Sequence, residues 1–311
     1  MFRPNRLSRR TILQAAAATG ALALPGPSRL TAQEAVPLHT RPVPTTGERL
    51  PVIGLGSWIT FNVGDDPVGR DACAEVMRAF FDGGGRLIDS SPMYGSSQAV
   101  IGYGIAKLGR PPGLFSATKV WTSSGAAGPG QIEESRELWG LPRLDLVQVH
   151  NLLSWQAHLE TLDSMKAEGR VRCIGITTSH GRRHDEIEEI MRTRPIDFVQ
   201  VTYNAVDREV EERILPLAGE RGIGVIVNRP FRGGSLVRSL EGEPLPPYAA
   251  EIGCTSWAQV LLKFAVSHPA VTCAIPATTQ VEHAREDIGA ARGPMPDERL
   301  RARIVADVEA I

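Results

Sequence analysis

The chain has 311 residues, of which 42% are hydrophobic and 22% charged, an ordinary composition for a globular protein. Its 34 basic and 35 acidic side chains leave a net charge of −1, so no long-range field attracts nucleic acid or an anionic membrane. Four cysteines lie far apart without a C-x-x-C pair, which argues against a zinc or redox site. We expect buried free thiols, with a disulfide left open should the chain enter an oxidising compartment.

The first 35 residues have the layout of an export signal. Arg9 and Arg10 precede a short, alanine-rich apolar stretch at residues 14–25, and this arrangement resembles twin-arginine signals. The stretch is too short for a stable membrane span. We therefore expect the export machinery to recognise residues 1–35 and deliver a periplasmic or secreted bacterial protein, the alternative being a disordered basic tail.

Residues 36–50 are rich in proline and threonine, and we expect a linker here that leads into one domain over residues 51–311. Through this domain, β-rich runs alternate with amphipathic stretches. Several runs are almost entirely apolar, as is typical of parallel strands buried on both faces. The predicted strands are 52–57, 86–91, 115–120, 144–150, 171–178, 197–203, 222–228 and 271–277.

The stretches between the strands have the periodicity of helices, most clearly at 72–82, 155–168, 183–192 and 208–220. Eight successive strand–helix units favour an α/β fold of the (β/α)8 TIM-barrel type over an open doubly wound sheet. Residues 296–311 predict an extra C-terminal helix. No G-x-G-x-x-G motif joins a strand to a helix, and the P-loop motif is absent from the sequence. Any dinucleotide must therefore be held in another way.

Polar side chains occur where successive predicted strands end. Asp89, Lys119 and His150 end the second, third and fourth strands, and Tyr94 follows Asp89 by five residues. Active sites of such barrels lie at the C-terminal ends of the strands. Reduction of a carbonyl needs a proton donor, and a nearby ammonium lowers the pKa of a phenol from its usual value of about 10. Asp89 can keep Lys119 charged, and His150 can orient the substrate oxygen or assist the proton transfer.

Each of these residues also has a structural explanation. Asp89 and Lys119 could form an ion pair within the barrel, His150 could be a satisfied core residue, and Tyr94 could cap a turn. Their shared position at one barrel mouth favours a functional role. A Schiff-base lyase that uses Lys119 is an alternative, but it needs a neutral amine, whereas Asp89 favours the charged one.

The sequence around these residues resembles that of the aldo-keto reductases. The longest similar run is Gly85-Arg-Leu-Ile-Asp-Ser-Ser-Pro-Met-Tyr-Gly-Ser-Ser97, and the likeness spans residues 46–292. Shorter runs are Ile53-Gly-Leu-Gly-Ser-Trp58, Thr118-Lys-Val-Trp121, Asp145-Leu-Val-Gln-Val-His150 and Ile275-Pro-Ala-Thr278. The resemblance implies reduction of an aldehyde or ketone by NAD(P)H, with a catalytic tetrad in which Tyr94 donates the proton. The tetrad residues are Asp89, Tyr94, Lys119 and His150.

The resemblance also implies a cofactor site, usually for NADPH, without a Rossmann motif. Gln200 matches a glutamine that binds the nicotinamide carboxamide, and Thr177 and Thr178 stand where many members carry Ser-Asn. Asn228 stands near the position of a stacking aromatic residue, which Arg229 or Phe231 can replace. The other cofactor residues implied are Gly56, Ser57, Trp58, Thr278, His283, Glu286 and Asp287.

The choice between the two nicotinamide cofactors depends on the 2′-phosphate. Ala277 and His283 replace the lysine and arginine that many members use to bind it. Their loss weakens the preference for NADP, because phosphate selectivity depends on charge-assisted hydrogen bonds. Arg285 is a potential replacement. NADP is the predicted cofactor, and NAD is the alternative.

The substrate side of the site is predicted to be apolar. Trp58, Met93 and Trp121 are expected to line a pocket for a small carbonyl compound. His180 and His184 have the i, i+4 spacing of a metal pair, but two arginines lie between them, so no metal site is predicted. The remaining alternative is a non-catalytic barrel that keeps a nicotinamide cofactor as a sensor or structural element, since free cofactor is expected to be scarce outside the cytoplasm.

Overall fold

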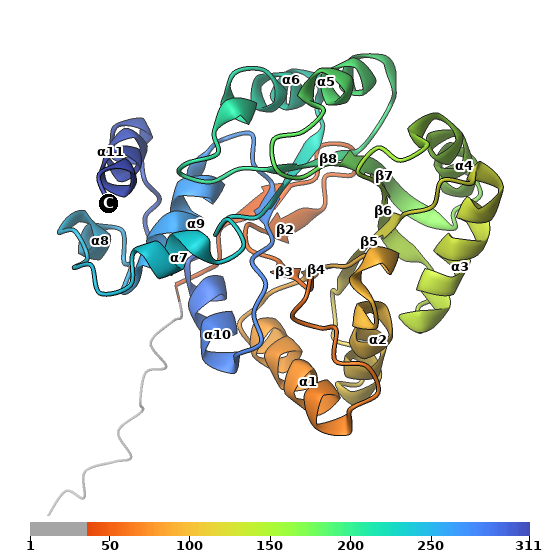
Figure 1. Ribbon diagram of the computed structural model, residues 1–311, viewed down its shortest axis with the longest axis horizontal. Coiled ribbons are helices and arrows are strands. Elements are labelled where there is room, and N and C mark those ends of the chain that lie inside the picture. The colour runs from red at the N-terminus through yellow and green to blue at the C-terminus, as the bar shows by residue number, and fades with distance from the viewer. Residues whose placement is uncertain (1–35) are drawn as a thin grey trace, which may run out of the picture. The chain divides into compact units, whose positions relative to one another are not determined.

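The predicted strands form a parallel sheet in the computed structural model, which describes residues 36–311. The sheet has eight strands in the order β3 to β10, each paired in parallel with the next (Figure 1). Isolated bridges from Ile53 to Ala274 and from Gly56 to Ala277 join its two edges, which closes the barrel. The predicted TIM-barrel fold is confirmed. The predicted signal at residues 1–35 lies outside the described residues.

The strand boundaries match the predicted runs closely except at the closure of the barrel. There β3 and β10 contain two residues each, because Pro276 lacks an N–H and only bridges continue the pairing. Gly56 permits this closure, since a Cβ atom there would lie 2.7 Å from the carbonyl oxygen of Ile275. The strands are β3 (Leu55–Gly56), β4 (Leu87–Asp89), β5 (Phe115–Val120), β6 (Leu144–His150), β7 (Val171–Thr177), β8 (Phe198–Thr202), β9 (Gly224–Asn228) and β10 (Cys273–Ala274).

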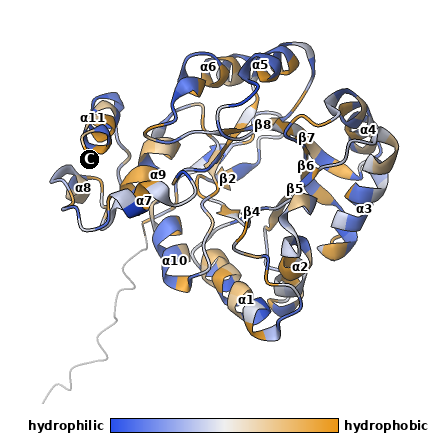
Figure 2. Cartoon of the chain, in the orientation of Figure 1, coloured by the Kyte–Doolittle hydropathy of each residue, from blue (hydrophilic) through white to orange (hydrophobic). Residues whose placement is uncertain are grey.

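Helices surround the strands, with hydrophobic residues toward the barrel and hydrophilic residues on their outer faces (Figure 2). The predicted helix at 208–220 is interrupted at Arg213, whose φ of −134° is not helical. The helices are α1 (Pro67–Asp82), α2 (Ser97–Lys107), α3 (Gly128–Leu138), α4 (Trp155–Ala167), α5 (His184–Thr193), α6 (Ile214–Arg221), α7 (Ser235–Ser239), α8 (Tyr248–Glu251), α9 (Trp257–Ser267), α10 (Val281–Gly289) and α11 (Glu298–Glu309).

The expectation of a linker at residues 36–50 was wrong. This segment and its continuation form a hairpin in which β1 (Thr40–Pro42) pairs antiparallel with β2 (Arg49–Pro51). Val43 and Leu50 are fully buried and belong to the core cluster inside the barrel. The hairpin therefore covers the N-terminal end of the barrel, and the opposite end carries the polar strand ends.

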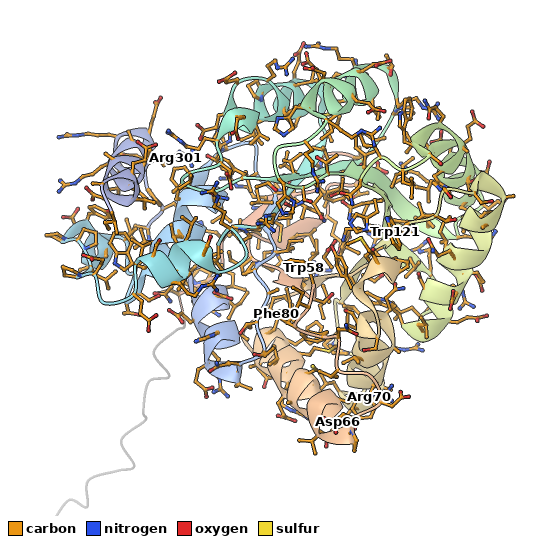
Figure 3. The ribbon with its side chains drawn as sticks, viewed as in Figure 1. Trp58, Asp66, Arg70, Phe80, Trp121 and Arg301 are labelled. Carbon is orange, nitrogen blue, oxygen red and sulfur yellow. The ribbon has the colours of Figure 1, made fainter. Side chains whose placement is uncertain are left out.

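The C-terminal helix predicted from the sequence is present as α11. Arg301 fixes it to the barrel: its guanidinium lies 4.5 Å from the ring centroid of Phe264 and 2.7 Å from Glu211 (Figure 3). All four cysteines are buried and free. Among residues 36–311, no helix is long and apolar enough to cross a membrane.

Candidate active site

A cavity of about 390 Å³ opens where the strands end at their carboxyl side. Its size is within the range typical of small-molecule sites. The loops after β3, β4, β6, β7, β9 and β10 contribute to its wall, together with Gln200 on β8. Of the predicted site residues, those that line it are Gly56, Ser57, Trp58, Asp89, Met93, Tyr94, His150, Thr177, Thr178, Gln200, Asn228, Arg229 and Phe231.

Lys119 and Asp89 form a buried ion pair directly beneath this cavity. The Nζ of Lys119 lies 2.5 Å from Oδ2 of Asp89 and also donates to the Ser90 carbonyl oxygen at 2.9 Å. Burial is the largest single effect and lowers the pKa of Lys119, but the charges and hydrogen bonds of Asp89 and Tyr94 together outweigh it, so the pKa lies above its usual value. The amine is therefore charged and does not line the cavity, and nothing in this arrangement favours the Schiff-base alternative.

Tyr94 reaches the cavity from a short 3-10 turn after β4, at Pro92–Tyr94. Ser91 caps this turn by accepting the N–H of Met93 at 3.2 Å. Gly95 follows with φ of 60°, where a Cβ atom would collide with Asn62 at 2.3 Å. The turn thereby places the Tyr94 ring 5.2 Å from Lys119 Nζ, measured to the ring centroid.

The phenol of Tyr94 retains its proton in this environment. Burial raises its pKa above the usual value, and the positive charge of Lys119 only partly counteracts this effect. The sequence predicted that the lysine would lower the pKa of Tyr94. The lysine acts in that direction, but desolvation is the larger effect. The phenol of Tyr94 thus carries its proton throughout the neutral pH range.

His150 is neutral at the same pH. Burial and the charge of Lys119 lower the pKa of its imidazole to about 3. Its ring meets that of Tyr94 edge to face, with centroids 5.7 Å apart at 85°. Its Nδ1 lies 2.8 Å from the Ser91 hydroxyl, a contact that the sequence interpretation missed although Ser91 lies between two predicted catalytic residues. The edge of the imidazole ring that carries Nε2 is the one available to a ligand in the cavity.

Polar residues on β7, β8 and β9 form one connected network on the cavity wall. Gln200 donates to Oδ1 of Asp89 at 2.9 Å and accepts from Thr177 at 3.2 Å. Asn228 accepts from Thr202 at 2.7 Å and donates to the Thr178 carbonyl oxygen at 2.8 Å. These hydrogen bonds hold the amide of Asn228, and Phe231, three residues further along, lines the cavity with an aromatic ring.

One end of the cavity is positively charged. Arg182 and Arg229 line it, and within residues 36–311 neither guanidinium pairs with a carboxylate. The nearby Asp207 is engaged by Arg232 instead, at 3.2 Å. Arginine side chains without a carboxylate partner suit the phosphates of a dinucleotide. Together with the amide and hydroxyl groups of the network, they fit a nicotinamide cofactor.

Several predicted residues are not brought into the cavity. Trp121 is 41% exposed and does not line it. Its backbone N–H and carbonyl oxygen are both hydrogen-bonded to the side chain of Gln131. Figure 3 shows Trp58 near the centre of the ring of helices and Trp121 farther out. Four other predicted site residues lie on or just before α10, outside the cavity wall: Thr278, His283, Glu286 and Asp287.

Three of these outlying residues either interact with each other or are buried in the protein. Thr278 Oγ1 lies 3.4 Å from His283 Nδ1. Asp287 is buried, and burial together with the charge of Glu286 raises the pKa of its carboxyl well above the usual value. Within the described part of the chain, no group of three potential metal ligands occurs, and this includes the surroundings of His180 and His184.

A phenol that keeps its proton, beside an imidazole able to donate to a carbonyl oxygen, defines a site suited to reducing carbonyl compounds. The family model described as the Aldo/keto reductase family matches residues 52–303. The chain belongs to this family. It is an NAD(P)H-dependent oxidoreductase that reduces carbonyl groups.

Known proteins share this assignment. The NADH-specific methylglyoxal reductase of Escherichia coli (strain K12) is 27% identical over 242 residues, which cover 66% of this chain and 71% of that protein. Methylglyoxal reductase YeaE of the same organism is 25% identical over 243 residues, or 76% and 84% of the two chains. The crystal structure of an aldo/keto reductase from Klebsiella pneumoniae in complex with NADP and acetate has a TM-score of 0.68 at 22% identity, covering 84% and 93%. This last likeness concerns the fold.

Proposed function

We propose that the protein reduces a small aldehyde or ketone to an alcohol, with Tyr94 as the proton donor. The observation that carries this proposal is the position of a protonated Tyr94 at the cavity wall, next to the Lys119–Asp89 pair. As the carbonyl oxygen gains negative charge, the phenol transfers its proton to it. The ammonium of Lys119 stabilises the phenolate that remains, and Asp89 keeps that ammonium in place.

His150 orients the substrate in this mechanism. A neutral imidazole is a hydrogen-bond donor at one nitrogen only, and the nitrogen next to the cavity can donate to the carbonyl oxygen. Because the pKa of His150 is lowered to about 3, the imidazole is not the proton source near neutral pH. The apolar side chains of Trp58 and Met93, which line the cavity, exclude water from the reacting carbonyl.

NADP is the proposed cofactor, with NAD as the alternative. The bound nicotinamide would supply the hydride. Gln200, Thr177 and Thr178 would hold its carboxamide, while Arg229 and Arg182 would bind the phosphates. The preference between the cofactors depends on the region of Ala277 and His283, which carries no lysine or arginine at those two positions. The NADH-specific relative supports keeping NAD as an alternative.

A fluorescence titration of residues 36–311 with NADPH and NADH, followed by an assay with a carbonyl panel, tests this function. Methylglyoxal is the first compound to include, because it is named for two relatives. We expect binding and turnover, with the tighter cofactor identified directly. Tight binding without turnover on any carbonyl would favour the sensor role. Binding of neither cofactor would contradict the proposal.

We further propose that residues 1–35 direct the folded protein, with its cofactor already bound, through the twin-arginine route to the periplasm or the medium. The pair Arg9-Arg10 before an apolar stretch supports this. Since free cofactor is expected to be scarce there, release of the nucleotide must be slow. Changing both arginines to lysine should retain the protein in the cytoplasmic fraction. An unchanged distribution, or an exported protein without nucleotide that rebinds it weakly, would contradict these proposals.

A further inference from the structure

Ser91 links two catalytic residues that belong to different strands. It is fully buried, and its hydroxyl lies 2.8 Å from Nδ1 of His150, which is 59 positions away in the sequence. The same oxygen accepts the N–H of Met93 at 3.2 Å, and the Ser91 carbonyl oxygen accepts the N–H of Tyr94 at 3.0 Å. One serine therefore holds both the turn of Tyr94 and the ring of His150.

The hydrogen-bond partners of the Ser91 hydroxyl determine which ring nitrogen of His150 carries the proton. A hydroxyl has one proton to donate, and within residues 36–311 the partners of Ser91 Oγ are Met93 N and His150 Nδ1. The backbone N–H of Met93 can only donate. If Nδ1 also carried a proton, the buried hydroxyl proton would have no acceptor, which is unfavourable. The O–H of Ser91 therefore donates to Nδ1, and Nδ1 is unprotonated.

The other nitrogen must then carry the proton, because the imidazole is neutral. His150 lines the cavity, and its Nε2 makes no hydrogen bond to the described residues. A protonated Nε2 presents an N–H to the cavity, which matches the oxygen of a carbonyl substrate. The opposite tautomer would present a lone pair to that oxygen and repel it.

We propose that Ser91 is a positioning residue that fixes His150 as the Nε2–H tautomer, so that His150 donates to the substrate carbonyl while Tyr94 alone transfers a proton. This inference rests on the proposed function of Tyr94 and His150. It assigns to the site a further hydroxyl-bearing residue, which does not line the cavity and acts through the imidazole.

The tautomer can be read directly in the wild-type protein by long-range 1H–15N NMR of the imidazole, with the His150 signals identified by their loss in His150→Gln. We expect an unprotonated Nδ1 and a protonated Nε2 at neutral pH. The reverse assignment would overturn the proposal. This measurement does not depend on turnover, so it stands even if the proposed reductase activity fails.

Variants then test the consequence for catalysis. Ser91→Ala should lower kcat for carbonyl reduction about tenfold, as expected for the loss of roughly one oriented hydrogen bond, while NADPH affinity changes less than twofold. It should also mix the two tautomers in the NMR spectrum. Ser91→Thr, which keeps the hydroxyl, should restore both readouts. Ser97→Ala is the matched control, because among residues 36–311 the hydroxyl of this buried serine has a single hydrogen-bond partner, Ser90 Oγ.

A Ser91→Ala variant in which His150 keeps the Nε2–H tautomer would overturn the proposal, even if kcat falls. Ser91 would then act only by capping the turn. A Ser91→Thr variant that binds NADPH normally but regains neither kcat nor the single tautomer would overturn the proposal too. Should Ser91→Ala fail to fold, the wild-type spectrum and Ser91→Thr still decide between the two assignments.

Discussion

Lys119 Nζ lies 2.5 Å from Asp89 Oδ2, and both side chains are at most 2% exposed. Asp89 receives two further hydrogen bonds, from Gln200 at 2.9 Å and from Gln148 at 3.3 Å. These contacts hold the Asp89 carboxylate in place. The ammonium is consequently held beside the phenol of Tyr94, where the proposed mechanism places the negative charge of a phenolate.

Removing one partner of this pair should harm both stability and activity. Lys119→Met leaves the Asp89 charge buried without its cation, and we expect the free energy of unfolding to fall by about 3–5 kcal/mol. Urea denaturation measures this, and adding Asp89→Asn should recover part of the loss because the buried charge is removed. Lys107→Met, in an exposed pair with Asp71, should have little effect. A Lys119→Met variant as stable as wild type would contradict the role of this pair.

The rate of reduction should be nearly independent of pH through the neutral range. The pKa of His150 is lowered to about 3, so the imidazole is neutral at every pH well above that value. The pKa of Tyr94 is raised, so the proton needed for reduction is still present at alkaline pH. We expect kcat to remain flat between about pH 5 and 9. An inflection near pH 6.5 that disappears in His150→Gln would show that this histidine titrates normally.

Cofactor affinity should depend on the unpaired arginine and much less on its paired neighbour. Arg229→Gln removes a charge-assisted hydrogen bond, and we expect NADPH to bind about tenfold more weakly. Arg232→Gln should change the Kd less than twofold, since Arg232 pairs with Asp207 and does not line the cavity. Fluorescence titration distinguishes the two variants. Equal losses would point to a general effect of net charge in this loop.

The two tryptophans predicted for the substrate pocket should behave differently. Trp58 lines the cavity and Trp121 does not. Trp58→Ala should raise KM for the carbonyl substrate several-fold, as expected when apolar contact is lost, whereas Trp121→Ala should leave KM within twofold. Steady-state kinetics at saturating NADPH measure both. A large effect of Trp121→Ala would restore the prediction made from the sequence.

The barrel and the four tetrad positions could be predicted because both follow from local patterns. Runs such as β9 are almost entirely apolar, and in a parallel barrel every strand ends at the same face, so residues such as Asp89 and His150 had to meet. The contact of Ser91 with His150 joins two residues 59 positions apart, and no local pattern reports such a distance. Ser91 could nevertheless have been considered from the sequence, because it is a polar residue within the motif that contains Tyr94.

Other features of the structure were not predicted, in part because the amino-acid composition suggested a different structure. Residues 36–50 look like a linker, yet Val43 and Leu50 are fully buried and fill the end of the barrel. The backbone of Trp121 is hydrogen-bonded by Gln131, ten residues further along, a contact that the sequence interpretation did not include. The pKa of Tyr94 results from burial against the charge of Lys119, a balance that only the folded structure determines.

The central claim is that Tyr94 donates the proton, and Tyr94→Phe tests it most directly. The variant should be assayed for carbonyl reduction beside the wild type, with NADPH affinity measured by fluorescence on the same samples. We predict that kcat falls at least a hundredfold while the Kd for NADPH stays within about twofold. A variant that binds NADPH normally and reduces the carbonyl at close to the wild-type rate would contradict the mechanism.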